Sequence, residues 1–152
     1  MPSGAIDAVI APAKAGEHIV ADGAGGLGDI VHGEVVADQR GNPTSALDIA
    51  DALIAIAARL KDDVSPALRG VFHMTGSGEA TWADLAETVF RQAAARGRRL
   101  THVRRIATAD YPTPARRPAN SRLDNEKLAR VYGVRLPEWR QSVAGCCDRL
   151  LS

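Results

Sequence analysis

The stretch from Gly23 to Gly28 reads GAGGLG and matches the G-x-G-x-x-G spacing of a phosphate-binding glycine loop. Such a loop needs a helix that opens on its last glycine, because the free N–H groups of the helix N-terminus hold the pyrophosphate. The sequence after Gly28 reads DIVHGEVV instead, which is rich in β-branched residues and has no helical spacing. We therefore expect a glycine connector here and no dinucleotide site.

A second group of polar residues lies in the segment from Pro114 to Asn120, which reads PARRPAN. The planar guanidinium groups of Arg116 and Arg117 suit paired hydrogen bonds to phosphate or carboxylate oxygens. The flanking prolines stiffen the loop and lower the entropy that is lost when an anion is clamped. The alternative is a structural ion pair with Asp110 or Asp124. We favour anion binding for Arg117 and the structural alternative for Arg116.

Two further polar groups precede predicted helices. Gln39 and Asn42 lie in a predicted turn over residues 39–43, just before a helix that is capped at Thr44 or Ser45. Loop polar groups at a helix N-terminus are well placed to meet a ligand, although turn and cap chemistry needs the same residue types. The run Gly76-Ser77-Gly78 also precedes a helix, and there we favour a tight turn over phosphate binding.

Other kinds of site are not indicated. The four histidines show no i,i+4 pairing and no neighbouring cysteine, so no metal site is predicted. No apolar run approaches the roughly 20 residues that span a bilayer, and we expect a cytoplasmic protein with no membrane partner. Cys146 and Cys147 are adjacent in a helical pattern, which suits packing in a reducing compartment.

Positive charge is concentrated between Arg91 and Arg122, where nine arginines accompany one acidic residue, Asp110. This stretch indicates either an anionic ligand or a solvated arginine-rich surface. Tyr111 is the one aromatic residue within it, so the interleaved aromatic residues of a single-strand nucleic-acid binder are absent. We expect no nucleic-acid partner.

The elements that must position these residues alternate between strands and helices, which predicts an α/β fold in one domain of 152 residues. Strands are expected at residues 18–20, 35–38, 70–76 and 102–106, and residues 111–120 form an extended proline-rich loop. Trp82 and Trp139 fit the core faces of two later helices. The first helix has one apolar stripe, formed by Ala50, Leu53, Ile54, Ala57 and Leu60.

Four segments of the chain resemble the dTDP-4-dehydrorhamnose reductase family of extended short-chain dehydrogenases/reductases. They read DQRGNPTSALDIADAL, HMTGSGEATWADLA, YPTPARRPANSRLD and LPEWR. The resemblance covers about residues 35–152 and implies the α/β, substrate-binding C-terminal region of a Rossmann-type enzyme without its Rossmann core. Residues 1–34 do not resemble the family and are expected to form a separate N-terminal segment.

The family uses NADPH or NADH and a catalytic Tyr-x-x-x-Lys pair. Here the residues four positions after Tyr111 and Tyr132 are Ala115 and Leu136, so no catalytic residue can be assigned. The resemblance implies an incomplete dTDP-4-dehydrorhamnose reductase that binds no cofactor and is inactive by itself. It also implies binding of a dTDP-sugar, with the diphosphate held by Arg117 and with Arg116 and Asn120 nearby. Gln39 and Asn42, from their place before a helix, are the further candidates for substrate binding.

Two alternatives remain open on the sequence. In the first alternative, the chain is a non-catalytic module that binds a nucleotide sugar or regulates a partner. In the second, it binds nucleic acid through its arginines. As protein partners, a second copy of the chain and a separate Rossmann-bearing chain are both compatible with the missing core.

Overall fold

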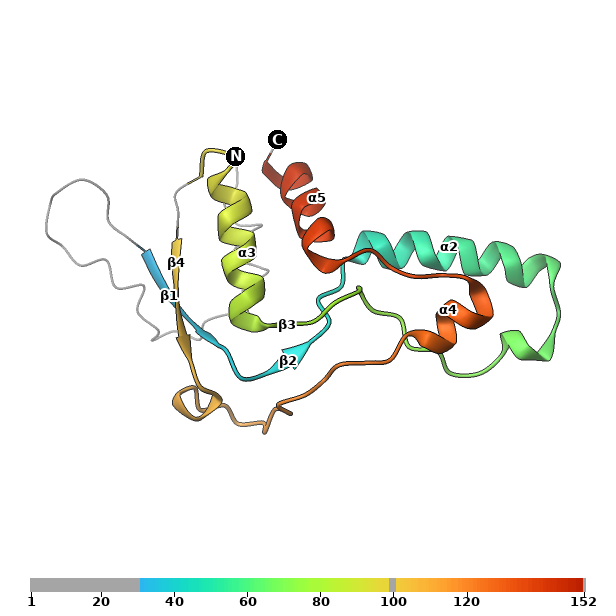
Figure 1. Cartoon of the computed structure of the whole chain (residues 1–152), viewed down its shortest axis with the longest axis horizontal. Helices are drawn as coiled ribbons and strands as arrows, with labels where there is room; N and C mark the ends of the chain where they lie inside the picture. Colours follow the sequence, from blue (N-terminus) through green and yellow to red (C-terminus); the bar gives the residue numbers. More distant parts are fainter. Residues whose placement is uncertain (1–30, 99–100, 152) are drawn as a thin grey trace, which may run out of the picture.

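The computed structural model describes residues 31–98 and 101–151 and has a mixed α/β fold, as the sequence predicts. Its sheet of β1 and β4 lies at one end of an elongated molecule, and α2 and α4 lie at the other end (Figure 1). No helix in this described part is both long and apolar enough to cross a bilayer. The elements are β1 (Val31–Val36), β2 (Arg40–Gly41), α2 (Ala46–Asp62), β3 (Ala80–Thr81), α3 (Trp82–Ala94), β4 (Thr101–Ile106), α4 (Glu126–Tyr132) and α5 (Trp139–Leu151).

Two small sheets organise the strands. β1 and β4 pair in parallel, in register from Val31 opposite Thr101 to Val36 opposite Ile106. β2 and β3 pair antiparallel, with Arg40 opposite Thr81. The predicted turn over residues 39–43 therefore contains a short strand. The GAGGLG stretch and the strand expected at residues 18–20 lie outside the described residues.

The strand expected at residues 70–76 is not formed. Side chains of α4 and of its N-cap residue, Asn125, hold this segment instead of a strand ladder. Lys127 donates to the carbonyl of Val71 at 2.8 Å, and Asn125 exchanges hydrogen bonds with Thr75. The ring of Phe72 packs edge-on against Tyr132, with centroids 5.2 Å apart. The β-branched and aromatic residues that suggested a strand thus serve contacts with a helix.

The packed core lies between α3, α5 and the β1–β4 sheet. A complete capping box of Thr81 and Asp84 starts α3, whose buried residues include Ala83, Ala86, Val89 and Ala93. From α5, Trp139 and Cys147 are buried, as their helical spacing predicts, and Trp139 is 1% exposed. The small side chains of α3 allow α5 to approach closely.

The prediction that Trp82 belongs to the core was wrong, because its side chain is 48% exposed. Its neighbour Ala83 is fully buried. Consecutive helical residues point about 100° apart, so burial of Ala83 turns Trp82 toward solvent.

The helix α2 begins where the sequence predicts, with Ser45 as its N-cap and the Ser45 hydroxyl accepting from the N–H of Leu47. In the first turn of α2, the Asp48 carboxylate accepts a hydrogen bond from the Ser142 hydroxyl of α5. Ser45 also contacts Cys146 of α5, at 3.7 Å between oxygen and sulfur. These side-chain contacts tie the start of α2 to α5.

Candidate functional site

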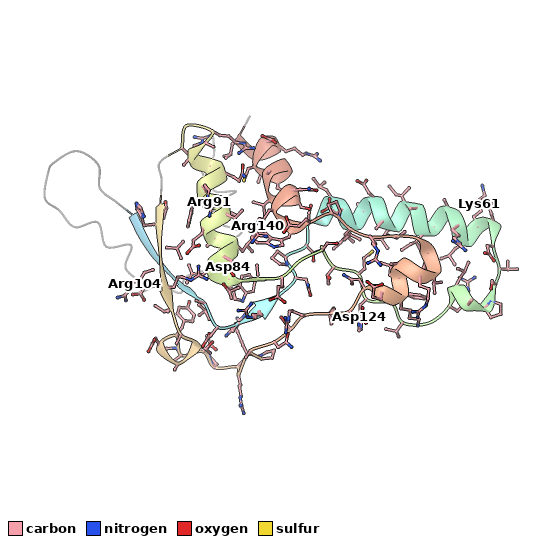
Figure 2. The ribbon with its side chains drawn as sticks, viewed as in Figure 1. Lys61, Asp84, Arg91, Arg104, Asp124 and Arg140 are labelled. Atoms are coloured by element: carbon pink, nitrogen blue, oxygen red, sulfur yellow. The ribbon has the colours of Figure 1, made fainter. Side chains whose placement is uncertain are left out.

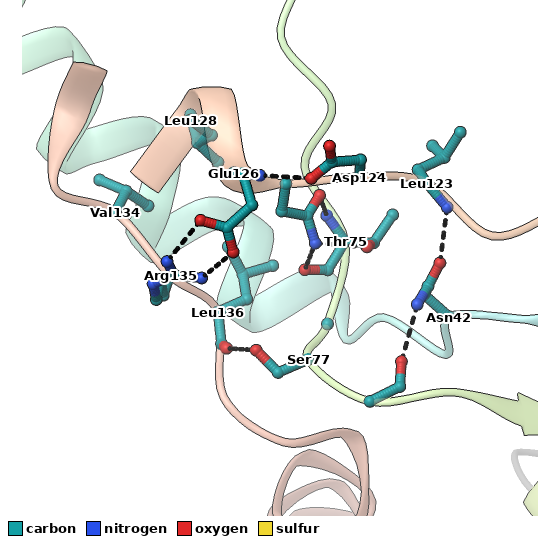
Figure 3. A pocket seen from close by; sticks show the side chains of 13 residues that line it. Asn42, Thr75, Ser77, Leu123, Asp124, Glu126, Leu128, Val134, Arg135 and Leu136 are labelled. Atoms are coloured by element: carbon teal, nitrogen blue, oxygen red, sulfur yellow. Dashed lines mark hydrogen bonds and ion pairs between the residues drawn. The ribbon is translucent and has the colours of Figure 1, made fainter. Parts of the chain in front are cut away.

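Three segments that are distant in sequence meet at Asn42, directly after β2. The amide of Asn42 donates to the carbonyl of Gly78 at 2.7 Å and accepts from the N–H of Leu123 at 2.9 Å (Figure 3). Main-chain bonds of Arg40 to Ala119 and Ser121, both 2.8 Å, hold the end of the proline-rich loop beside β2. The side chain of Asn42 therefore pins β2, the glycine turn and the proline-rich loop together.

Two hollows lie on either side of this junction. A cavity of about 350 Å³ extends toward α4 and the segment before α5, and an open groove of about 500 Å³ extends toward Asn120 and Arg122. Both are within the size range of small-molecule sites. The two hollows adjoin, and together we call them the depression. They share four lining residues: Asn42, Gly78, Leu123 and Asp124.

The walls of the cavity are held by polar contacts within the protein (Figure 3). Arg135 donates two hydrogen bonds of 2.8 Å to the carboxylate of Glu126, and this contact lowers the pKa of Glu126. The Ser77 hydroxyl donates to the carbonyl of Leu136 at 2.6 Å, and Asp124 accepts from the N–H of Glu126 at 2.8 Å. The cavity is therefore preformed, and its shape does not depend on a ligand.

The glycine turn at residues 76–78 serves packing, as we favoured from the sequence. A Cβ atom at Gly76 would lie 2.3 Å from the carbonyl oxygen of Pro43, and Gly78 has a φ of +85°. The N–H of Gly76 donates to the Thr44 hydroxyl and the N–H of Ser77 donates to the carbonyl of Pro137. With two of its N–H donors occupied, the turn is less suited to cradle a phosphate than a glycine loop is.

In the groove, the carboxylate of Glu79 binds two arginines. It accepts from Arg40 at 2.8 Å and also pairs with Arg122. The hydrogen bond from Arg122 is the main reason that the pKa of Glu79 is lowered; burial opposes it, and Arg40 adds to the lowering. Neither Glu79 nor Arg122 is predicted from the sequence as a site residue, because their ion pair joins chain segments 43 residues apart.

The structure brings together some of the residues predicted to bind substrate and separates others. Asn42 and Asn120 both line the groove. Arg116 and Arg117 are exposed on the adjoining loop and line neither hollow. Gln39 is 8% exposed and donates to the Thr108 hydroxyl at 3.0 Å, which is a structural contact outside both hollows.

Several arginines of the stretch from Arg91 to Arg122 form ion pairs with acids outside it. Besides the pair of Arg122 with Glu79, the ion pairs are Arg96–Asp148, Arg104–Glu34, Arg105–Asp84 and Arg105–Glu87. Within the described residues, no ion pair holds Arg116 or Arg117. Figure 2 shows the labelled Arg91 and Arg104 on separate elements, α3 and β4. Four of the nine arginines thus have structural partners, and Arg116 and Arg117 are among those that no ion pair holds in the described part of the chain.

The described residues do not fit a nicotinamide cofactor. The residues that follow GAGGLG form the strand β1 from Val31, where a dinucleotide fingerprint requires a helix. The hydroxyl of Tyr132 donates to the carbonyl of Leu68 at 2.6 Å, and neither tyrosine is followed by a lysine four residues later. Residues 31–98 and 101–151 also contain no cluster of three or more metal-ligating side chains.

Known proteins match the chain over the part that contains this depression. The family model described as the RmlD substrate binding domain matches residues 31–152. The dTDP-4-dehydrorhamnose reductase of Sinorhizobium fredii is 54% identical over 108 residues, which are 71% of this chain and 36% of that protein.

Solved structures share the fold. The dTDP-4-dehydrorhamnose reductase of Clostridium acetobutylicum is 30% identical and superposes with a TM-score of 0.69 over 80% of this chain and 39% of its own. A reductase of the same name from Bacillus anthracis, solved in complex with NADP, is 23% identical and has a TM-score of 0.65. That match covers 78% of this chain and 38% of the Bacillus anthracis chain. This chain thus spans less than half the length of these relatives. It belongs to the family of the RmlD substrate-binding domain, to which it is matched over residues 31–152, and the three relatives named above are dTDP-4-dehydrorhamnose reductases.

Proposed function

We propose that this chain is the nucleotide-sugar-binding part of a dTDP-4-dehydrorhamnose reductase and binds a dTDP-sugar without reducing it. The observation that carries the proposal is the depression formed by the two adjoining hollows at Asn42. It lies within the segment that matches the substrate-binding domain, and it is bordered by the loop that carries Arg116 and Arg117.

A dTDP-sugar offers this surface a diphosphate and a set of hydroxyl groups. Arg117 is the proposed diphosphate ligand, because its guanidinium is exposed on a proline-stiffened loop and has no ion pair within the described residues. Arg116 stands beside it as a second cation. In the groove, the side-chain oxygen of Asn120 accepts a hydrogen bond from Nε of Arg122 at 2.9 Å. The side-chain NH₂ group of Asn120 is then the proposed donor to a ligand oxygen. Asn42 has one remaining amide hydrogen for the same purpose.

Catalysis is assigned to a part of the family enzyme that the described residues do not include. In a complete reductase the nicotinamide supplies the hydride, and the tyrosine of the Tyr-x-x-x-Lys pair supplies the proton. Because no residue here fits either role, this chain positions the substrate only. We expect no oxidation of NADPH by the isolated chain with dTDP-4-dehydrorhamnose.

Titration of dTDP into the ¹⁵N-labelled chain tests the binding step. Without the opposite wall of a complete site, we expect a Kd of roughly 0.1 to 5 mM. Charge-assisted hydrogen bonds contribute about 1.5 to 3 kcal/mol each, so Arg117→Ala should weaken binding about tenfold or more. Arg91→Ala, which removes an exposed arginine of α3, is the matched control and should leave the Kd unchanged. Equal binding by the wild type and Arg117→Ala would refute the role of Arg117, and shifts far from the depression would refute the site.

A further inference from the structure

Two arginines from distant segments converge on one carboxylate at the groove. Arg40 lies in β2, and Arg122 follows the proline-rich loop. Each binds a different oxygen of Glu79: Arg40 binds Oε1 at 2.8 Å, and Arg122 binds Oε2. Glu79 is ionised at neutral pH, because the hydrogen bond from Arg122 lowers its pKa. The two guanidinium groups thus share one anionic group through its two oxygens, as arginines do when they recognise a carboxylate or a phosphate.

The main chain holds the two arginines close together. Arg40 forms a parallel bridge with Asn120, and the carbonyl of Arg40 accepts a hydrogen bond from the N–H of Ser121 at 2.8 Å. The two segments approach so closely that a Cβ atom at Gly41 would lie 3.0 Å from the hydroxyl oxygen of Ser121. The spacing of the arginines is therefore set by backbone contacts that do not involve Glu79.

The side chain of Arg122 is oriented by a second contact. Its Nε and its main-chain N–H both donate to the side-chain oxygen of Asn120, at 2.9 and 3.1 Å. The terminal nitrogens of the guanidinium group remain for an anion, and Nη1 binds Glu79. A guanidinium group that is already oriented loses little further conformational entropy when it binds an anion.

Glu79 is the replaceable member of this cluster. The side chains of Arg40, Glu79 and Arg122 are 54%, 42% and 41% exposed. Ion pairs between side chains this exposed contribute little to stability, because water and salt screen them. A rotation of Glu79 into solvent therefore frees both guanidinium groups at a small cost in free energy. A terminal phosphate group carries a charge of about −1.5 to −2 and three acceptor oxygens at pH 7, so it competes favourably with a single carboxylate.

We propose that Arg40 and Arg122 form a phosphate-binding site that the Glu79 carboxylate occupies in the free protein. An incoming phosphate group displaces Glu79 and takes its place between the two guanidinium groups. Asn42 and Asn120 line the same groove, and their side-chain NH₂ groups are donors for a further phosphate oxygen. The inference goes beyond the proposed function, because the site requires neither a nucleotide nor the arginines of the proline-rich loop.

Titration of inorganic pyrophosphate into the ¹⁵N-labelled whole chain tests the site without a nucleotide. We expect a Kd of roughly 1 to 10 mM, with large shifts of the Arg122 Nε–H and the Asn120 side-chain amide. Arg40→Gln and Arg122→Gln each remove one guanidinium group and should weaken binding at least about fivefold. Arg59→Gln is the matched control and should leave the Kd unchanged, because Arg59 is comparably exposed and pairs with an acid on α2, away from the groove.

Glu79→Gln tests the displacement itself. If the carboxylate occupies the site, its removal should tighten pyrophosphate binding about threefold or more. The same substitution should change the Kd less than about twofold when Arg40 and Arg122 are both replaced by glutamine, because no site is then left to vacate. A glutamate that only stabilised the fold would not show this dependence on the arginines. If Arg122→Gln does not fold, the double-mutant cycle of Glu79→Gln with Arg40→Gln gives the same test.

The outcomes separate this site from the proposed role of Arg117. Unchanged pyrophosphate binding by Arg40→Gln and Arg122→Gln would overturn the proposal, as would weaker binding by Glu79→Gln. Loss of pyrophosphate binding in Arg117→Ala, with full binding by Arg122→Gln, would move the phosphate site to the proline-rich loop and leave the proposed function standing. Pyrophosphate binding that requires Arg122, in a chain that does not bind dTDP, would support the site and contradict the proposed function.

Discussion

The carboxylate of Asp84 lies 2.5 Å from Nη2 of Arg105, and this ion pair joins the first turn of α3 to β4. Burial alone would raise the pKa of Asp84. The hydrogen bonds from the backbone and hydroxyl of Thr81 and from Arg105 outweigh that effect and lower the pKa from 3.8 to about 2. One carboxylate thus caps a helix and fixes a strand beside it.

Asp84→Asn should destabilise the chain at neutral pH and have little effect in acid. A carboxyl group whose pKa is lower in the folded state stabilises the fold at pH values above its unfolded-state pKa. For Asp84 this stabilisation is lost as the pH falls from about 4 to about 2. Because 33% of the side chain is exposed and water screens the pair, we expect a loss of about 1 kcal/mol at pH 7. Urea unfolding at pH 7 and pH 2 measures it, with the exposed Asp62→Asn as control. A difference that persists at pH 2 would contradict the assignment.

The two tryptophans should differ sharply in their contribution to stability. Trp139 is 1% exposed and its ring lies against Gly78, so Trp139→Ala leaves a large cavity at the start of α5 and should cost about 3 to 5 kcal/mol. Trp82 is 48% exposed, and Trp82→Ala should cost less than about 1 kcal/mol. Thermal melts followed by far-ultraviolet circular dichroism compare the variants. Similar losses would show that Trp82 is packed in solution.

Two glycine-to-alanine changes should act in opposite directions. A Cβ at Gly76 would meet the carbonyl oxygen of Pro43 at 2.3 Å, so Gly76→Ala must displace backbone and should cost at least about 2 kcal/mol. Gly145 lies in α5 with no atom within 4 Å of the added Cβ, so Gly145→Ala should stabilise by about 0.5 to 1 kcal/mol. Chemical unfolding measures both. A neutral Gly76→Ala would mean that the turn is looser than the structure shows.

Removal of the Glu79 charge should strengthen dTDP binding. The carboxylate occupies Arg40 and Arg122 in the groove and repels an incoming diphosphate. Glu79→Gln releases both arginines, and we expect a Kd about threefold to tenfold lower in low salt. Glu87→Gln removes an acid outside both hollows and is the control. Weaker binding by Glu79→Gln would indicate that the carboxylate itself contacts the ligand or holds the groove open.

Much of the secondary structure follows from local sequence. Helical spacing and caps predict α2, α3 and α5, because Ser45 and Thr81 satisfy helix N–H groups that belong to their own segments. The strand at β4 and the irregular loop after Tyr111 follow from β-branched residues and prolines in the same way. The family could likewise be predicted, since the run YPTPARRPANSRLD is a local motif.

The tertiary structure decided which apolar stripe is covered and which polar residues meet. The stripe of α2 has the same spacing as a core helix, yet its burial depends on a neighbour that local sequence does not describe. Residues 70–76 became irregular because α4, some 50 residues later, supplies their hydrogen-bond partners. The groove places Asn42 beside Asn120 and pairs Glu79 with Arg122 while leaving Arg117 at its border. These pairings form because the fold brings distant segments of the chain together. Residue spacing along the sequence predicts only which side chains share a face within one helix or strand.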